Sequence, residues 1–251
     1  RRYYRAAEAA AVRLSDAIIA DAQGIADYYA QEFKAPTTLI AYGAPIADAG
    51  TERLGELDLR PGGFHLVVAR FEPENHVDVV VEGYVRSDAA LPLVVVGSAP
   101  YSDAYTERIA SLADERVRLP GGIWDQELLD QLYAGALVYY HGHSVGGTNP
   151  SLLRAIGAGA AVDAFDVSFN REVLGDAGRY WRGADDVTRL VASAEADPAA
   201  QAARGELSRQ RAALYDWDEV ADRYEALCRD LAASGPRRER PSGRRTGIAP
   251  S

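Results

Sequence analysis

The chain has 251 residues, of which 47% are hydrophobic and 25% charged, a composition typical of a globular protein with a sizeable core. Its net charge of −10 argues against nucleic acid as a partner, because neutralising many phosphates needs a broad surplus of Lys and Arg. The single cysteine, Cys228, excludes an internal disulfide and predicts a reducing compartment, the cytoplasm.

Three further features of the sequence concern its start, its apolar runs and its C-terminal tail. The chain begins at Arg1 and contains no methionine, which indicates that an N-terminal part is missing. It has no apolar run of about 18 residues, so we expect no membrane span and at most peripheral membrane contact, for example at the inner membrane face. Residues 234–251 are rich in Pro, Gly and Arg without an apolar face, which predicts a disordered tail. Its arginines either stay solvated or touch an anionic membrane.

Short apolar runs alternate with segments of helical period, the pattern of βαβ units. The predicted strands are 17–20, 37–41, 64–69, 92–97, 116–119, 136–140 and 160–165. The predicted helices lie near 22–34, 75–87, 102–113, 126–134 and 150–158, with two or three more after 186. The run Leu93–Val96 is apolar on both alternating faces, as in a parallel sheet covered on both sides. The fold class predicted is therefore α/β, with a doubly wound parallel sheet.

Gly and Pro residues punctuate the stretch 46–62, which has no sustained apolar period and reads as an interdomain linker. Residues 1–45 hold only a helix, a strand, a helix and a strand, so they form a partial α/β segment. Residues 63–233 are predicted to form the main domain, ending in a helix with the amphipathic stripe Trp217, Val220, Tyr224 and Leu227.

A glycine-rich segment, residues 141–151, leaves one predicted strand and opens a helix. Its sequence is His-Gly-His-Ser-Val-Gly-Gly-Thr-Asn-Pro-Ser. Asn149 suits the N-cap and Pro150 the first helical position, and the free NH groups of such a turn form an anion site that fits a diphosphate. The alternative is that Asn149 only caps the helix and the glycines only turn the chain. The loop by itself does not separate the two interpretations.

Arg70 follows a second strand, at the sheet edge where doubly wound folds bind their ligands. Its guanidinium could hold a phosphate in bidentate fashion. The alternative is an ion pair with Glu72 or Glu74.

These motifs together resemble one known family, the retaining family 4 glycosyltransferases. The resemblance runs from Phe64 to about Leu227 and is closest to the branch that includes bacterial rhamnosyltransferases. It rests on Arg70 with Pro73-Glu74-Asn75, Val95-Val96-Gly97, Gly121 to Asp125, the segment 141–153, and Asp166 to Leu174. It implies a Rossmann-like C-terminal domain of the GT-B type over 63–233, which binds a nucleotide sugar. Residues 1–45 resemble the end of the family's N-terminal, acceptor-side domain.

The resemblance also assigns roles to residues. The donor diphosphate and sugar would be held by Arg70, Asn75, Gly146, Gly147, Thr148, Asn149 and Ser151. The nucleotide would be bound by Gly97, Gly121, Ile123 and Arg154. His141 and His143 would line the pocket; as a metal pair they lack a third ligand, so we expect no metal and no cofactor. A catalytic residue is not assigned.

Arg154 departs from the family, which has a ribose-binding glutamate there. A guanidinium has only donors and cannot accept from two hydroxyls. Arg154 would weaken donor binding if it points into the site; otherwise it contacts phosphate or turns to solvent.

The resemblance implies transfer of a sugar, with rhamnose as a candidate, from a nucleoside diphosphate to a glycan or lipid-linked acceptor of polysaccharide synthesis, with retention. The alternative is a catalytically incomplete nucleotide-sugar-binding protein, or half of a split enzyme that needs a separate N-terminal domain chain. A Rossmann-type oxidoreductase is disfavoured, because no Gly-x-Gly-x-x-Gly turn follows any strand.

Overall fold

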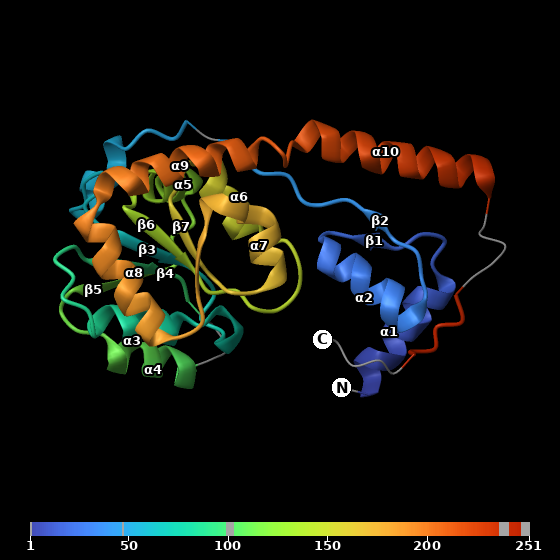
Figure 1. The fold of residues 1–251 in the computed structure, drawn as a ribbon, viewed down its shortest axis with the longest axis horizontal. Helices are drawn as coiled ribbons and strands as arrows, with labels where there is room; N and C mark the ends of the chain where they lie inside the picture. Colours follow the sequence, from blue (N-terminus) through green and yellow to red (C-terminus); the bar gives the residue numbers. More distant parts are fainter. Residues whose placement is uncertain (1, 47, 99–102, 236–240, 247–251) are drawn as a thin grey trace. The chain divides into compact units, whose positions relative to one another are not determined.

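The computed structural model describes residues 2–46, 48–98, 103–235 and 241–246, and these form two compact units. The larger unit comprises Ala44–Val145 and Asn149–Leu214. The smaller unit holds the residues up to Gly43, the short stretch Gly146–Thr148 and the chain from Tyr215 onward. Figure 1 shows the course of the chain through both.

The larger unit is built on a six-stranded parallel sheet with the order β5-β4-β3-β6-β7-β8. The strands are β3 (His65–Val68), β4 (Leu93–Val96), β5 (Val117–Gly121), β6 (Val138–His141), β7 (Val162–Phe165) and β8 (Arg179–Trp181). All four residues of β4 are buried, as their apolar character on both faces predicts. The predicted α/β class with a doubly wound parallel sheet is confirmed.

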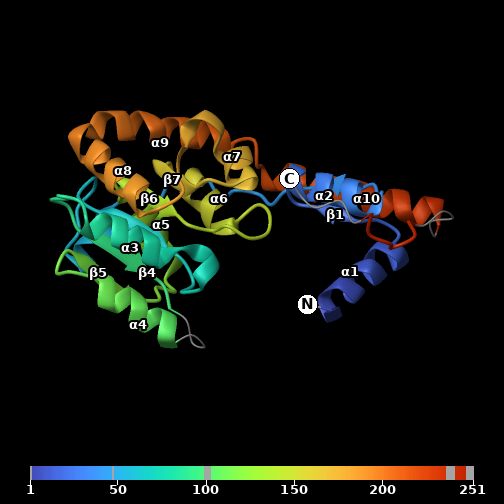
Figure 2. The ribbon, with the colours of Figure 1, turned by 60° about the horizontal axis from the view of Figure 1, so that its bottom comes forward.

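Helices cover both faces of this sheet. They are η1 (Glu52–Leu57), η2 (Pro73–Asn75), α3 (Val77–Val85), α4 (Asp103–Leu112), α5 (Gln126–Gly135), α6 (Pro150–Gly157), α7 (Ser168–Leu174), η3 (Gly175–Ala177), α8 (Ala184–Ala196) and α9 (Pro198–Ala212). Helices α3 and α4 lie on one face and α5 and α6 on the other, and Figure 2 shows α9 on the side away from α4. Helix α8 packs on α3, and α9 packs on α6.

The seven predicted strands all correspond to observed ones, but β8 was not predicted. Its three residues, Arg-Tyr-Trp, are too few and too polar to give a periodic signal. The strand is held by Trp181, which is buried against Phe165 with ring centroids 5.1 Å apart and donates from its Nε1 to the Asp163 carbonyl oxygen at 3.1 Å.

The stretch expected to be a linker, 46–62, belongs to the larger unit. Helix η1 packs on α5, where Leu54 is fully buried beside Gly135, and the Arg53 amide donates to the Gln131 side chain at 2.7 Å. This packing was not predictable from the sequence, because Leu54 is the one buried residue of this short helix.

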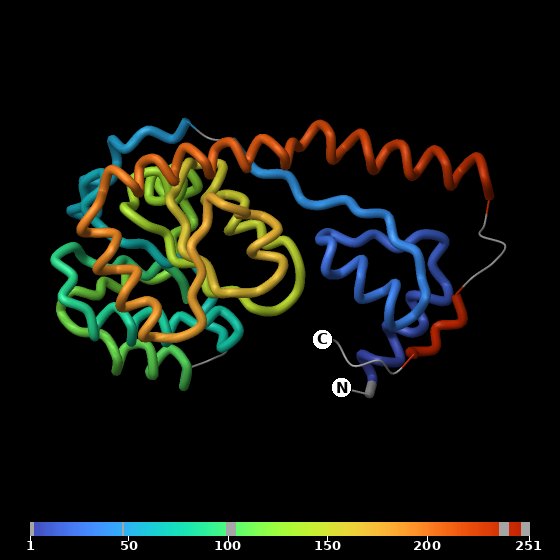
Figure 3. Tube along the Cα trace, viewed as in Figure 1, coloured from blue at the N-terminus to red at the C-terminus, as the bar shows by residue number. Residues whose placement is uncertain are grey.

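The smaller unit contains α1 (Arg2–Leu14), β1 (Ile19–Ala20), α2 (Gln23–Phe33), β2 (Thr38–Leu39) and α10 (Trp217–Ser234). Strands β1 and β2 form a two-stranded parallel sheet, and Figure 3 traces this segment in blue. Helix α10 was expected in the main domain, packed along its apolar stripe. It groups with the smaller unit instead, and of the stripe only Val220 is buried.

Part of the tail expected to be disordered makes defined contacts with α2. Arg245 Nε lies 2.9 Å from the Glu32 carboxylate, and the Thr246 amide donates to the Glu32 carbonyl oxygen at 2.6 Å. An ion pair to a buried carboxylate explains the order of 241–246. The rest of the expected tail beyond Gly235 lies outside the described residues.

Within the described residues, no helix is long and apolar enough to cross a bilayer.

Candidate functional site

A cavity of about 280 Å³ lies in the larger unit where β3, β4 and β5 end. Its walls come from the residues that follow these strands and from the first turns of α5 and α6. The lining residues are Val68, Ala69, Arg70, Val96, Gly97, Ser98, Gly122, Ile123, Trp124, Gln126, Leu129 and Ser151. Of the residues predicted from sequence, this cavity brings together Arg70, Gly97, Ile123 and Ser151.

The cavity adjoins the point where the strand order reverses. Strand β3 lies between β4 and β6, so the chain leaves β3 toward one side of the sheet and later returns to its other side. Arg70 follows β3, and Ser151 lies in the helix that follows β6. Open α/β sheets bind ligands in the crevice at such a switch point.

Arg70 is exposed, and within the described part of the chain its guanidinium makes no hydrogen bond or ion pair. The alternative of an ion pair with Glu72 or Glu74 is therefore not what these residues show. A cation without a partner beside a cavity is available to an anionic ligand.

The loop that carries Arg70 is tied to the glycine-rich loop. Ser144 donates from its amide and its hydroxyl to the Glu74 carbonyl oxygen, at 3.0 and 3.1 Å. His76 Nδ1 lies 2.9 Å from the Gly142 carbonyl oxygen, and a Cβ on Gly142 would overlap the Asn75 carbonyl oxygen. A glycine at 142 therefore allows the two loops to approach closely.

Asn75, expected at the diphosphate, is buried behind this edge and does not line the cavity. Its amide nitrogen donates to the Arg70 carbonyl oxygen at 2.9 Å, and its oxygen lies 2.8 Å from His143 Nδ1. With both polar atoms engaged, Asn75 fixes the backbone at Arg70.

Helix α6 begins as its sequence predicts. The Asn149 side chain accepts from the Ser151 amide at 2.8 Å, and Pro150 occupies the first helical position. That amide is therefore occupied, as the capping alternative requires, and the helix contributes the Ser151 side chain to the cavity. Ser151 Oγ lies 2.7 Å from the Tyr133 hydroxyl and 3.0 Å from that of Tyr139.

Burial further disfavours ionisation of these two tyrosines. It raises the pKa of Tyr133 to about 12 and raises the pKa of Tyr139 well above its usual value. Both therefore stay hydroxyl groups at neutral pH and hold the Ser151 side chain by hydrogen bonds on the cavity wall.

The residues Gly146, Gly147 and Thr148 group with the smaller unit, where the Thr148 hydroxyl donates to the Asp21 carbonyl oxygen at 2.6 Å. A Cβ on Gly147 would collide with the Asp21 carboxylate. The structure therefore groups Asn149 and Ser151 with Arg70, but not the three residues before them.

Arg154 does not line the cavity, because it is held by a carboxylate on α5. Its Nε and one terminal nitrogen lie 2.5 and 3.0 Å from the two Asp130 carboxylate oxygens, and it also donates to Gln126. This bidentate pair raises the pKa of the guanidinium. Arg154 therefore does not point into the site, toward a phosphate position or into solvent, the three orientations expected from the sequence. It is paired with a carboxylate of the same unit.

The two histidines of the loop lie beside the cavity rather than on its wall. His141 is buried, with Nδ1 2.9 Å from the Tyr139 hydroxyl, and burial followed by the charge of His143 lowers the pKa of His141 to about 3. Burial also lowers the pKa of His143. Their ring centroids are 6.2 Å apart, and no group of three metal-ligating side chains occurs among the described residues.

The β5 side of the cavity carries the residues expected at the nucleotide. Ile123 lines it, while Gly121 only turns the chain toward it with φ +83°. Gly97 is needed for packing, because a Cβ there would overlap the Ala69 carbonyl oxygen. Sequence reasoning missed Trp124, which is 84% exposed on the cavity wall; its place after the turn at Gly121 was the available signal.

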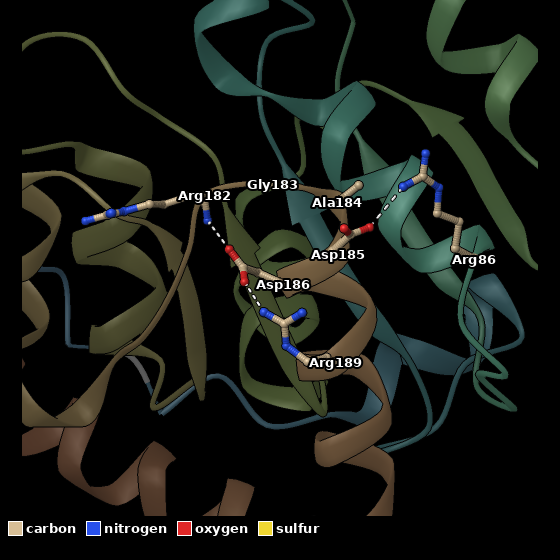
Figure 4. A pocket seen from close by; sticks show the side chains of 7 residues that line it. All are labelled: Arg86, Arg182, Gly183, Ala184, Asp185, Asp186 and Arg189. Carbon is tan, nitrogen blue, oxygen red and sulfur yellow. Dashed lines mark hydrogen bonds and ion pairs between the residues drawn. The ribbon is translucent and has the colours of Figure 1, made fainter.

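A second cavity, of about 500 Å³, lies at the start of α8. Figure 4 shows its lining: Arg86, Arg182, Gly183, Ala184, Asp185, Asp186 and Arg189. Its charges are already paired, since Arg86 lies 3.2 Å from Asp185, Asp186 pairs with Arg189, and Arg182 lies 2.8 Å from Asp166. We therefore take the smaller cavity as the candidate site.

The parallel sheet and its switch point are those of the GT-B fold, which solved glycosyltransferase structures share with this chain. No family model matches the sequence. The structural similarity therefore establishes the fold.

Two solved structures illustrate it. Sucrose-phosphate synthase from Thermosynechococcus elongatus superposes with a TM-score of 0.79 at 22% identity, covering 94% of this chain and 63% of that one. HepE of Anabaena, solved with UDP-glucose, superposes with a TM-score of 0.76 at 17% identity, covering 91% of this chain and 67% of that one.

Among curated proteins, the UDP-N-acetylglucosamine–peptide N-acetylglucosaminyltransferase GtfA subunit of Streptococcus gordonii is 29% identical over 118 residues. That match covers 45% of this chain and 22% of the relative, so the chain spans only a part of the relative's length.

Proposed function

We propose that this chain is the donor-binding part of a glycosyltransferase and that the 280 Å³ cavity binds a nucleoside-diphosphate sugar. The observation that carries the proposal is that Arg70, whose guanidinium has no partner among the described residues, and the hydroxyl of Ser151 line one cavity at the switch point of the sheet. The GT-B fold supports it, as do the UDP-sugars named for HepE and the Streptococcus gordonii relative.

The chemistry follows from charge. In transfer from a nucleotide sugar, the bond between the sugar and the diphosphate breaks, so negative charge grows on the leaving diphosphate while positive charge develops on the sugar ring. Arg70 would neutralise the diphosphate, and the positive end of the α6 dipole adds to this field. Ser151 would donate to a phosphate oxygen. These groups stabilise the leaving group; a base for the acceptor is not assigned.

The motifs of the sequence support a finer proposal. The His-Gly-His segment and its Gly-Gly-Thr-Asn-Pro continuation resemble family 4 enzymes, which implies retention at the anomeric carbon, with rhamnose as a candidate sugar and a glycan or lipid-linked acceptor of polysaccharide synthesis. The lone cysteine supports cytoplasmic placement. We keep the proposal that neither a metal nor a cofactor is needed.

The test is a donor panel. The chain is incubated with UDP-glucose, UDP-N-acetylglucosamine and dTDP-rhamnose, and both binding and nucleotide release are followed. We expect at least one donor to bind. Arg70→Ala should weaken the binding of that donor on the order of 10-fold, because a charge-assisted hydrogen bond is lost. Arg86→Ala, which removes an arginine from the other cavity, is the matched control and should bind as the unmodified chain does. Binding of no donor would refute the proposal.

A second candidate is a nucleotide-sugar-binding chain that is inactive alone and works with a separate acceptor-side chain. The relative in Streptococcus gordonii is described as a subunit, and Arg154 is locked onto Asp130 where the family has a glutamate. Donor binding without turnover would favour this candidate. Turnover restored by adding a separately expressed acceptor-side domain would support a split enzyme; no effect of that domain would count against it.

A further inference from the structure

Trp124 is exposed to an extent that its position does not require. It is 84% exposed, whereas Trp181 of the same unit is 1% exposed. Tryptophan side chains usually bury a large apolar area in folded proteins. A solvent-exposed indole on a cavity wall therefore indicates a ligand-binding surface.

The local structure offers a simpler role, which the exposure excludes. Trp124 directly precedes Asp125, the N-cap of α5, and an apolar residue there often packs on the fourth residue of the helix, here Leu129. A ring packed on Leu129 in this way would be largely covered. Trp124 and Leu129 instead both face the cavity, with most of the indole in solvent.

The backbone that carries the indole is held firmly. The Asp125 carboxylate accepts from the Leu128 amide at 3.1 Å and pairs with Arg53 at 2.9 Å, which ties the turn to η1. Gly122 lies under the ring: a Cβ there would meet the indole Nε1 at 3.3 Å. The absence of a side chain at 122 therefore lets the ring lie against the turn without hindrance.

The cavity has different chemistry on its two sides. Toward β5 and α5 it is lined by the indole, Ile123 and Leu129, and toward β3 and α6 by Arg70 and Ser151. Strands β5 and β3 are separated by one strand, which places these sides about 10 Å apart, because neighbouring strands lie about 4.8 Å from each other. A nucleoside diphosphate has the same division: a flat aromatic base, a ribose spacer, and a doubly charged diphosphate.

We propose that Trp124 is the base-stacking residue of this site, on which the nucleobase of the donor lies while Arg70 holds the diphosphate. The inference rests on the proposed function and adds to it a residue that determines nucleotide affinity. Stacking on an indole tolerates any base, because every base has a π-face. Trp124 therefore contributes affinity for the nucleoside portion, and the choice among bases depends on other groups.

The first test compares probes with and without a base. Titration calorimetry measures the affinities of UDP and of inorganic pyrophosphate for the unmodified chain, for Trp124→Ala and for Trp124→Phe. We expect Trp124→Ala to weaken the binding of UDP on the order of 10-fold, which is the usual loss for one base–aromatic stack. Trp124→Phe should keep most of the UDP affinity, because it keeps an aromatic ring. Pyrophosphate affinity should not change. Leu119→Ala, an exposed position on β5 outside this cavity, is the control.

A second readout does not depend on pyrophosphate. In a Trp217→Phe background the two remaining tryptophans are Trp124 and the buried Trp181, so UDP stacked on Trp124 should quench the emission. Replacing Trp124 with Phe should abolish that quenching.

Three results would overturn the inference. Unchanged UDP affinity in Trp124→Ala would refute stacking while leaving the proposed function intact. An equal loss for UDP and pyrophosphate would show that the indole only supports the turn. Failure of the unmodified chain to bind UDP, GDP or dTDP would refute the proposed function, and the inference with it.

Discussion

Asn75 joins the two loops of the candidate site, because its side-chain oxygen lies 2.8 Å from Nδ1 of His143. Its amide nitrogen is committed to the Arg70 carbonyl oxygen at 2.9 Å, so the oxygen must be the acceptor and His143 carries its proton on Nδ1. The loop that follows β3 is thereby held against the loop that follows β6.

Replacing Asn75 with Ala tests this bridge. The change removes the Asn75 hydrogen bond to the Arg70 carbonyl oxygen, which still accepts from the Glu72 amide, and leaves the His143 Nδ1–H without its partner. We expect the free energy of unfolding to fall by about 1–3 kcal/mol. UDP affinity should fall as well, since the Arg70 backbone is no longer fixed. Urea unfolding and calorimetry measure the two effects. Ser144→Ala, which keeps its amide hydrogen bond to Glu74, should have a smaller effect on both; equal effects would argue against a special role for Asn75.

The pair of Arg154 with Asp130 predicts the outcome of introducing a glutamate at position 154, where the resemblance led us to expect one. Arg154→Glu places two carboxylates together in a partly buried position, so the free energy of unfolding should fall by about 1–3 kcal/mol, and UDP should not bind more tightly. The reversed pair, Arg154→Glu with Asp130→Arg, should recover much of the stability. Thermal unfolding of the unmodified chain and of these two variants measures this coupling. A stable single variant with improved UDP binding would contradict it.

His141 predicts a specific loss of stability in acid. Burial lowers its pKa from 6.5 to about 3 in the folded protein, whereas in the unfolded chain it takes up a proton near 6.5. Its contribution to stability is therefore complete above pH 6.5 and is lost as the pH falls toward 3, at up to about 1.4 kcal/mol per pH unit. The free energies of unfolding of the unmodified chain and of His141→Gln are measured between pH 7.5 and 4.5. Below pH 6.5, the slope of the free energy against pH should be steeper for the unmodified chain by the uptake of one proton, up to about 1.4 kcal/mol per pH unit. Parallel curves would show that another group governs acid unfolding.

The order of strands and helices was largely predictable, because the information lies in short stretches of sequence. Leu93–Val96 is apolar on both faces and forms the buried strand β4, and Asn149-Pro150 marks the start of α6. Strand β8 was missed because its burial depends on Trp181 reaching Phe165, a contact between distant segments.

The candidate site was predictable to the same degree. Arg70 and Ser151 follow neighbouring strands, and parallel strands end at one edge, so their presence in one cavity follows from the fold. The pairing of Arg154 with Asp130 and the exposure of Trp124 were not predictable, since both depend on which groups of other helices lie within reach. Gly146, Gly147 and Thr148 were placed at the diphosphate by the resemblance and by the glycine-rich turn, and in the structure these three residues group with the smaller unit.

The most direct test of the central claim is a crystal structure of the chain with UDP bound. The account predicts the diphosphate in the 280 Å³ cavity, with the Arg70 guanidinium and the Ser151 hydroxyl within hydrogen-bonding distance of its oxygens. A diphosphate bound instead among Arg86, Arg182 and Arg189 at the start of α8, with Arg70 free, would contradict it.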